Sequence, residues 1–185
     1  MRVLSPIPDP LLPRAARLWW GAFGRTARPL GDMGQAVAAR GVVAMDNRGQ
    51  VVGVMGLRDA SGGFFDLPPG WLDWLYRPGP ATDDLVVDGI VVCADSRRAG
   101  VGRALVAAAL AHAQALGRPG LRAEVLARNR VAVGFWSAVG FELVGRGRAG
   151  WIWNGPALYL RRGVQNDGCG QRGVLGQTGS RGLGP

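Results

Sequence analysis

The sequence has no lysine, a single histidine, only two cysteines and no long apolar run. No segment approaches the roughly 20 apolar residues that a membrane span requires, and the N-terminus lacks the pattern of a signal peptide. We therefore expect a soluble cytoplasmic protein without a membrane partner. Cys93 and Cys169 lie far apart, which argues against a disulfide framework and against a metal site. His112 lies in an Ala-rich helical stretch, so a catalytic triad built on histidine has little support.

All of the positive charge comes from arginine. The chain carries 22 basic and 13 acidic side chains, which gives a net charge of +9. Such a balance can attract nucleic acid or suit a phosphate-rich ligand. Because the arginines are scattered along the chain, a basic module that binds nucleic acid or ribosomes is kept only as an alternative.

The length and the periodicity predict one α/β (α+β) domain over residues 1–162, followed by a disordered Gly-rich tail over residues 163–185. We expect a mixed, mostly antiparallel sheet flanked by helices. The first helix should begin at Asp9-Pro10 and end at Gly24, and a second short helix is expected over Asp32–Arg40. Further helices are predicted over Val101–Leu116 and Val131–Val139.

Strands are expected on both sides of a long aromatic loop over Ser61–Ala81, which should hold one helical turn near Trp71–Tyr76. A near-continuous apolar run, Leu85–Val92, predicts a central strand, and its Asp88-Gly89 interruption indicates a bulge. The remaining strands are predicted in a hairpin before the loop and in three segments near the C-terminus: Gly41–Met45, Gln50–Leu57, Leu121–Ala127, Phe141–Gly147 and Trp151–Leu160.

One glycine motif joins the central strand to the Ala-rich helix. It reads Arg97-x-x-Gly100-x-Gly102, and Arg98 and Arg103 add charge beside it. The first N–H groups of a helix have no intrahelical partners, and glycines allow an anion to approach them closely. The motif lacks the Lys-Ser/Thr ending of a nucleotide-binding loop and the third glycine of the dinucleotide fingerprint. It therefore predicts a diphosphate cradle, or alternatively a turn that needs small residues for packing.

The segment from Leu85 to Phe141 resembles the GNAT superfamily of acyl-CoA-dependent N-acyltransferases. The glycine motif resembles its pyrophosphate signature, and Asp88-Gly-Ile-Val-Val92 resembles its bulged fourth strand. Ala123-Glu-Val-Leu-Ala-Arg-Asn129 resembles its fifth strand, and Gly134-Phe-Trp-Ser-Ala-Val-Gly-Phe141 its next helix. The resemblance covers about a third of the chain.

The resemblance implies an acetyl-CoA site, with acetyl-CoA as a co-substrate and no metal. The backbone from Arg98 to Arg103 would hold the pyrophosphate, and Asn129 would contact the CoA arm or cap the following helix. Trp136 occupies the position of a family tyrosine that protonates the leaving thiolate, and indole cannot supply that proton near neutral pH. The cofactor-binding residues implied in this way are Ile90, Val91, Val92, Arg97, Arg98, Ala99, Gly100, Val101, Gly102, Arg103, Asn129 and Trp136.

The acceptor amine needs a general base, because an alkylamine with a pKa of about 10 is protonated at pH 7. Glu124 is the first candidate, by its resemblance to N-terminal-amine acetyltransferases of the family, and Asp88 in the buried strand is the second. We expect an N-acetyltransferase acting on a primary amine by direct attack in a ternary complex, as a monomer or a homodimer. A non-catalytic acyl-CoA-binding domain is the alternative. Trp71, Trp74, Trp151 and Trp153 indicate either an aromatic acceptor site or core positions.

Overall fold

The structure is a computed structural model that describes residues 1–27, 33–67 and 69–164. Its main helices are α1 (Leu12–Ala27), α2 (Val101–Ala115) and α3 (Arg130–Ala138). The large sheet of the described residues contains, in spatial order, β1 (Arg2–Leu4), β3 (Gly41–Met45), β4 (Val51–Arg58), β7 (Leu85–Val92), β8 (Gly120–Leu126), β11 (Ala157–Gly163) and β9 (Glu142–Gly147).

Two short strand pairs lie beside this sheet. One joins β2 (Gln35–Ala36) to β5 (Phe65–Asp66), and the other joins β6 (Tyr76–Arg77) to β10 (Gly150–Trp151). Three single 3₁₀ turns occur among the described residues: η1 (Ala38–Arg40), η2 (Asp73–Leu75) and η3 (Ala94–Ser96).

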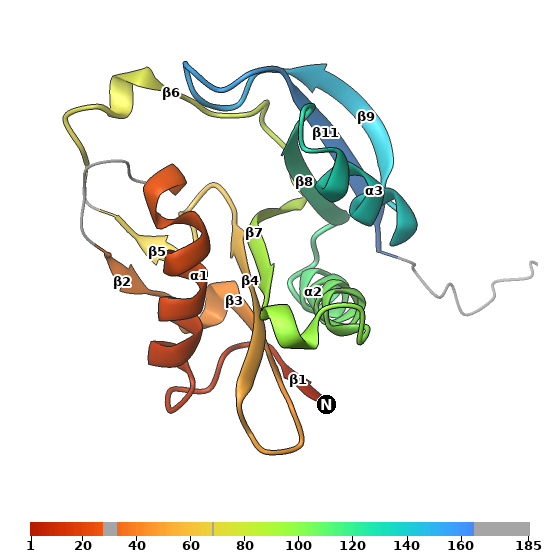
Figure 1. Ribbon diagram of the computed structural model, residues 1–185. Coiled ribbons are helices and arrows are strands. Elements are labelled where there is room, and N and C mark those ends of the chain that lie inside the picture. The colour runs from red at the N-terminus through yellow and green to blue at the C-terminus, as the bar shows by residue number, and fades with distance from the viewer. Residues whose placement is uncertain (28–32, 68, 165–185) are drawn as a thin grey trace, which may run out of the picture.

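The large sheet is mixed and mostly antiparallel, as predicted. Only β7 and β8 run parallel, and they pair over just three positions, from Leu85↔Leu121 to Val87↔Ala123. Figure 1 shows the two strands diverging beyond these pairs, with β8 continuing beside β11 and β7 beside β4. Beyond these pairs the facing edges of β7 and β8 are not hydrogen-bonded to each other, which leaves a gap in the middle of the sheet.

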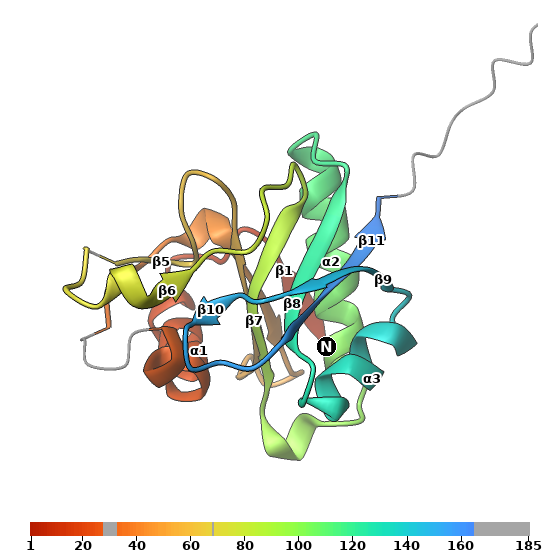
Figure 2. The same cartoon turned by 90° about the horizontal axis from the view of Figure 1, so that it is seen from above.

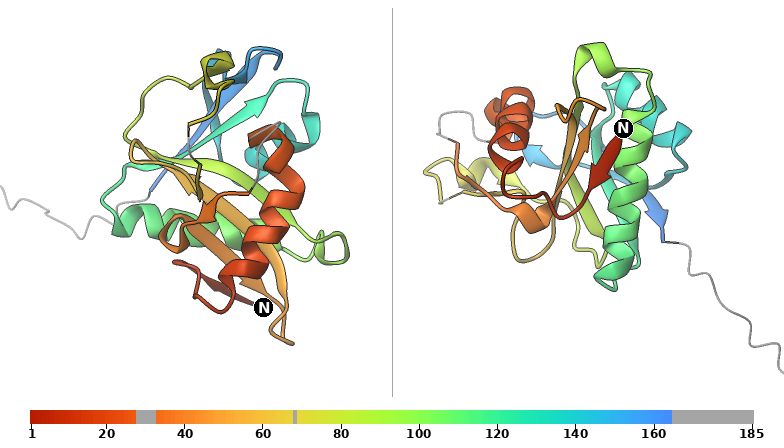
Figure 3. Two further views of the ribbon diagram at one scale, coloured as in Figure 1. Left: turned by 90° about the vertical axis from the view of Figure 1, so that its left-hand side faces the viewer. Right: turned by 90° about the horizontal axis from the view of Figure 1, so that it is seen from below.

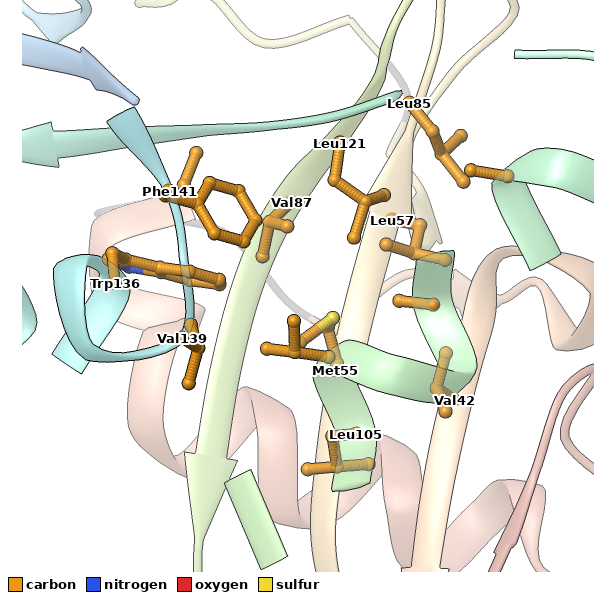
Figure 4. Packing of buried hydrophobic residues seen from close by; sticks show 14 of the residues in the cluster. Val42, Met55, Leu57, Leu85, Val87, Leu105, Leu121, Trp136, Val139 and Phe141 are labelled. Carbon is orange, nitrogen blue, oxygen red and sulfur yellow. The ribbon is translucent and has the colours of Figure 1, made fainter. Parts of the chain in front are cut away.

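Helices cover both faces of the sheet. Figures 2 and 3 show α1 on one face and α2 on the other, with α3 beside the end formed by β8, β9 and β11. The α2 face holds the larger core, and Figure 4 shows Met55, Leu105 and Leu121 among its members. The α1 face holds a smaller, aromatic core that includes Trp19 and Phe64. Both faces of the central strands are therefore buried, which explains their near-continuous apolar sequences.

The predicted bulge in the central strand is confirmed. The pairing of β4 with β7 jumps from Gly56↔Gly89 to Leu57↔Val87, so Asp88 has no partner residue. On one side of the bulge Val87 packs in the α2-side core, and on the other side Ile90 packs against the same core. The extra residue turns Asp88 and Gly89 together toward the α1 face and keeps the apolar residues that follow in phase with the core.

Two helix predictions are wrong. The helix α1 begins at Leu12 and not at Asp9-Pro10, and it does not end at Gly24 but continues to Ala27, since each interior glycine costs only about 1 kcal/mol. The short helix predicted over Asp32–Arg40 is replaced, from residue 33 onward, by β2 and η1. There the backbone pairs with the aromatic loop, and the N–H of Val37 donates to the carbonyl of Phe64 at 2.8 Å. A short isolated helix is marginal in water, so strand pairing prevails.

The aromatic loop Ser61–Ala81 contains β5, β6 and the expected helical turn, which is η2. The last strand β11 extends to Gly163, one residue beyond the predicted domain end, and the N–H of Val164 donates to Pro119 at 3.0 Å. The rest of the predicted tail, including Cys169, lies outside the described residues. None of the described helices is long and apolar enough to cross a membrane.

Candidate active site

The glycine turn before α2 has the geometry of an anion cradle. Gly100 is the N-cap with φ of +80°, and Arg98 also has a positive φ of +63°. Among the described residues, the backbone N–H groups from Arg98 to Arg103 have no backbone hydrogen-bond acceptor. They lie at the positive end of the α2 dipole, and Arg97, Arg98 and Arg103 all have exposed side chains. The turn can therefore receive a diphosphate.

Gly102 has a packing role as well. A Cβ placed on it would lie 3.0 Å from the ring of Phe135 in α3, so the absence of a side chain lets the two helices approach each other. The packing interpretation of the motif is confirmed at Gly102, and Gly100 supplies the left-handed turn before α2. The diphosphate cradle stays a prediction.

The strand β7 offers free backbone groups to the gap. The N–H of Cys93 donates to Val52 in β4 at 2.9 Å. Hydrogen bonds of an antiparallel ladder alternate along the strand, so Val91 also faces β4, whereas Ile90 and Val92 face the gap. Of the three residues predicted to contact the pantetheine arm, Ile90 and Val92 can do so through their backbone, and Val91 is used by the ladder.

A pocket of about 180 Å³ opens beside this gap on the α1 side. Asp88 and Glu124 line it, each at the first position beyond the last β7–β8 pair. The short β6–β10 pair contributes Tyr76 and Trp151 to the lining of the pocket. The remaining lining residues are Trp19, Phe23, Arg58, Val87, Leu126, Ala149, Gly150, Asn154 and Ala157.

Two arginines hold the carboxylate of Glu124. Arg58 donates to its Oε2 at 2.7 Å, and Arg122 donates to its Oε1 at 2.9 Å. Glu124 and Arg122 are only 10% and 7% exposed in their side chains. Arg122 also donates to the carbonyl of Pro80 and lies over the ring of Tyr159. Both oxygens of Glu124 are thus engaged by arginine side chains.

Asp88 is less restrained. Its Oδ1 lies 3.6 Å from Arg58 Nε, and its Oδ2 accepts a 3.3 Å hydrogen bond from the N–H of Phe64. Burial raises the pKa of the Asp88 carboxyl above its usual value, although Arg58 and the Phe64 N–H oppose this. Although Tyr76 is 40% exposed, desolvation on its pocket side raises the pKa of its phenol, which is protonated at neutral pH. The pocket thus combines a carboxyl of increased basicity with a phenolic proton donor.

Several predicted site residues lie elsewhere. Asn129 is the N-cap of α3, where its side-chain oxygen accepts from the N–H of Ala132 at 3.1 Å. Trp136 is 4% exposed and packs in the α2-side core, beside Phe141 and Val139 in Figure 4. A contact between its ring and the cofactor therefore has no support from its surroundings.

The other aromatic candidates divide into two groups. Trp151 is buried and lines the pocket, whereas Trp71, Trp74 and Trp153 are more than half exposed and so are not core residues. Tyr159, the other tyrosine of the chain, donates to the carbonyl of Arg148 and does not line the pocket. His112 hydrogen-bonds through its ring to the carbonyl of Ala39, in agreement with a structural role.

Sequence reasoning missed Trp19, Phe23, Arg58 and Tyr76 as site residues. Trp19 and Phe23 have the helical spacing of core residues, and Trp19 does belong to the α1-side core. Arg58 directly follows the predicted strand Gln50–Leu57, as many solvent-exposed arginines do, and the structure includes it as the last residue of β4. Only Tyr76 gave a signal, because it lies in the aromatic loop identified as a binding element.

Comparison with known proteins gives one family. The model of the family described as "Acetyltransferase (GNAT) family" matches residues 12–141. The solved structure of nourseothricin acetyltransferase is 26% identical, with a TM-score of 0.51, and the match covers 68% of this chain and 65% of that one. This chain therefore spans just under two thirds of the length of that relative.

Two further structures share the fold over almost their whole length. A GCN5-related N-acetyltransferase from Kribbella flavida is 22% identical, with a TM-score of 0.56 and coverage of 88% of this chain and 96% of that chain. A structure described as an acetyltransferase is 15% identical, with a TM-score of 0.65 and coverage of 89% and 100%. No curated protein sequence matches the chain.

Proposed function

This chain belongs to the GNAT acetyltransferase family, and we propose that it transfers the acetyl group of acetyl-CoA to a primary amine by direct attack in a ternary complex. One arrangement carries the proposal. The anion cradle before α2 and the β7–β8 gap lead to a pocket that contains Asp88 and Glu124. The pyrophosphate of the co-substrate would contact the amides of residues 98–103, and its pantetheine arm the backbone of Ile90 and Val92.

The amine must lose a proton to react. Asp88 is the base that the surroundings favour, because it lies in the bulge, lines the pocket and has a raised pKa. Glu124, the first candidate from the sequence, is held by two arginines and would instead fix Arg58 beside Asp88. The ammonium form of the amine first loses one proton to Asp88, which passes it to solvent. The nitrogen lone pair then attacks the thioester carbonyl carbon, the carbon–sulfur bond breaks, and the second N–H proton passes to Asp88.

The thiolate leaves with the carbon–sulfur electron pair and needs a proton. Trp136 cannot donate one near neutral pH, and it lies in the core. Tyr76 is the protonated phenol that lines the pocket, so it is our candidate donor. A thiol has a pKa of about 8.5, so a thiolate that takes its proton from water would also be an acceptable leaving group.

The test is release of free CoA from acetyl-CoA, measured with a panel of primary amines and with matched tertiary amines. We expect release with at least one primary amine and none with tertiary amines, which have no N–H proton left to lose after the nitrogen has attacked and so cannot form an amide. Calorimetric titration with CoA accompanies the assay. Tight CoA binding without turnover of any amine would instead support the non-catalytic acyl-CoA-binding alternative.

A further inference from the structure

Two arginines hold the segment between β6 and β7, residues 78–84, against the sheet. Within the described part of the chain, this segment makes no hydrogen bond between backbone groups. Arg122 donates to the carbonyl of Pro80 at 2.7 Å. Arg161 donates to the two carboxylate oxygens of Asp84 at 2.8 and 3.0 Å. The two arginines are direct partners across β8 and β11, so both side chains leave the same face of the sheet and reach the segment that crosses it.

The anchor at Pro80 brings the chain directly onto Glu124. A Cβ placed on Gly79 would collide with Oε1 of Glu124 and would lie 2.8 Å from Nη2 of Arg122, so a side chain there would have to displace the carboxylate. Arg122 donates to the same Oε1 at 2.9 Å. Its side chain is 7% exposed, and burying a cation costs free energy that these contacts must offset. The backbone of Gly79 therefore rests on the ion pair of Arg122 and Glu124.

This contact is close in the chain to a wall of the pocket. Tyr76 lines the pocket, and β6, which carries it, is a strand of only two residues that pairs with the equally short β10. Between Tyr76 and the anchor, the chain reads Arg77-Pro78-Gly79-Pro80. Each proline fixes its own φ angle and restricts the residue before it, so this stretch is stiff. A displacement at Pro80 is therefore passed on to Tyr76.

We propose that Arg122 is a positioning residue for acetyl transfer, which holds Tyr76 at the acceptor pocket by binding the carbonyl of Pro80. Arg122 does not line the pocket, so it acts through the segment and not on the substrate. The role belongs to the bond between Arg122 and Pro80, which does not involve the charge of Glu124. The proposal rests on the proposed acetyl transfer to amines and adds what keeps one wall of the acceptor pocket in place.

The experiment disturbs the contact from both sides. Arg122→Lys keeps a positive charge beside Glu124, but an ammonium group lacks the planar fork that reaches Glu124 and Pro80 together. Gly79→Ala keeps every charge and pushes the segment off the carboxylate. In both variants kcat/KM for an amine that the wild type acetylates should fall about 10- to 100-fold, since a misplacement of about 1 Å can cost 10²-fold.

The affinity for CoA should not change in either variant. The anion cradle follows the end of β7 at Val92, whereas the segment precedes its start at Leu85. Calorimetric titration with CoA gives the Kd, and its stoichiometry counts the folded molecules to which kcat/KM is referred. A loss of kcat/KM at an unchanged Kd separates displacement of the pocket wall from general damage to the fold.

The matched control is Arg161→Lys, which weakens the other anchor of the same segment. Asp84 directly precedes Leu85, which pairs with Leu121 in the sheet, so this end of the segment stays in place without the arginine. Arg161→Lys should therefore leave kcat/KM unchanged. An unchanged kcat/KM in either Arg122→Lys or Gly79→Ala, or an equal fall in Arg161→Lys, would overturn the proposal.

A second measurement does not depend on turnover. The chain contains two tyrosines, Tyr76 and Tyr159, so ¹³C-labelled tyrosine gives two sets of ring signals in the NMR spectrum, which Tyr76→Phe assigns. The Tyr76 signals should shift in Arg122→Lys and Gly79→Ala and stay in place in Arg161→Lys. Unmoved Tyr76 signals in the first two variants would overturn the proposal. If the Tyr76 signals shift as expected but the wild type acetylates no amine, the proposed function fails, and Arg122 remains the residue that fixes Tyr76.

Discussion

The two carboxylates of the pocket should respond in opposite ways to removal of their charge. Asp88→Asn keeps the shape of the side chain and deletes its basicity. If Asp88 is the base, turnover near pH 7 should fall by about 10²–10⁴-fold, which corresponds to about 3–5 kcal/mol at the transition state. The deficit should shrink as the pH rises toward the pKa of the amine at about 10, where solvent has already deprotonated the substrate.

The same substitution should not weaken the fold at neutral pH. Burial raises the pKa of Asp88 above its unfolded value, so the folded protein favours the neutral carboxyl. The stability that this provides is fully present below about pH 4 and is lost as the pH rises through the raised pKa. The stability of Asp88→Asn relative to the wild type should therefore increase from pH 4 to pH 7, as measured by urea unfolding.

Glu124→Gln should lower the stability of the fold and not the turnover. It removes the shared partner of Arg58 and Arg122, which lie 2.7 and 2.9 Å from its oxygens. Breaking a buried ion pair costs about 3–5 kcal/mol, and the lower value applies because Arg58 is 27% exposed in its side chain. For a domain of this size, a loss of about 3 kcal/mol lowers Tm by about 6–12 °C.

Turnover of amines, measured from pH 6 to 9, and thermal unfolding of both variants show whether Asp88 or Glu124 is the general base. The reasoning fails if Asp88→Asn keeps wild-type turnover while Glu124→Gln loses turnover at an unchanged Tm. That outcome would make Glu124 the base, as the sequence first indicated, and would make Asp88 a structural residue of the bulge.

Three further predictions concern the cradle, the bulge and the C-terminus. Ala99→Glu adds negative charge before α2 and should weaken CoA binding at least tenfold by calorimetry, whereas the same change at the exposed Ala107 on that helix should not; equal affinities would exclude the cradle. Gly89→Ala places a methyl group 2.9 Å from Phe23 and should lower Tm by about 2–10 °C. An unchanged Tm would show that the aromatic side chains rearrange to accommodate the methyl group. Removal of residues 165–185, which contain few large apolar side chains, should leave Tm and CoA affinity unaltered, and a loss of several degrees would contradict this.

The local parts of the site could be predicted from the sequence because they depend on neighbouring residues. A left-handed N-cap requires a residue such as Gly100, and unpaired amides follow wherever a helix begins. Asp88-Gly89 interrupts an apolar run, so a regular strand would either bury the Asp88 carboxylate in the core or turn the following apolar side chains to the opposite face. A bulge avoids both outcomes. These features also fixed the family resemblance.

The pocket itself could not be predicted, because its walls come from segments far apart in the chain. Trp19, Arg58 and Tyr76 meet Glu124 only after α1, β4 and β6 have packed around the sheet. Whether Glu124 is a base or an ion-pair partner depends on two arginines at 2.7 and 2.9 Å, and no spacing in the sequence encodes those distances. Local hydrogen bonds and periodicity therefore determined the glycine turn and the bulge, whereas long-range packing and charge pairing decided which side chains line the pocket.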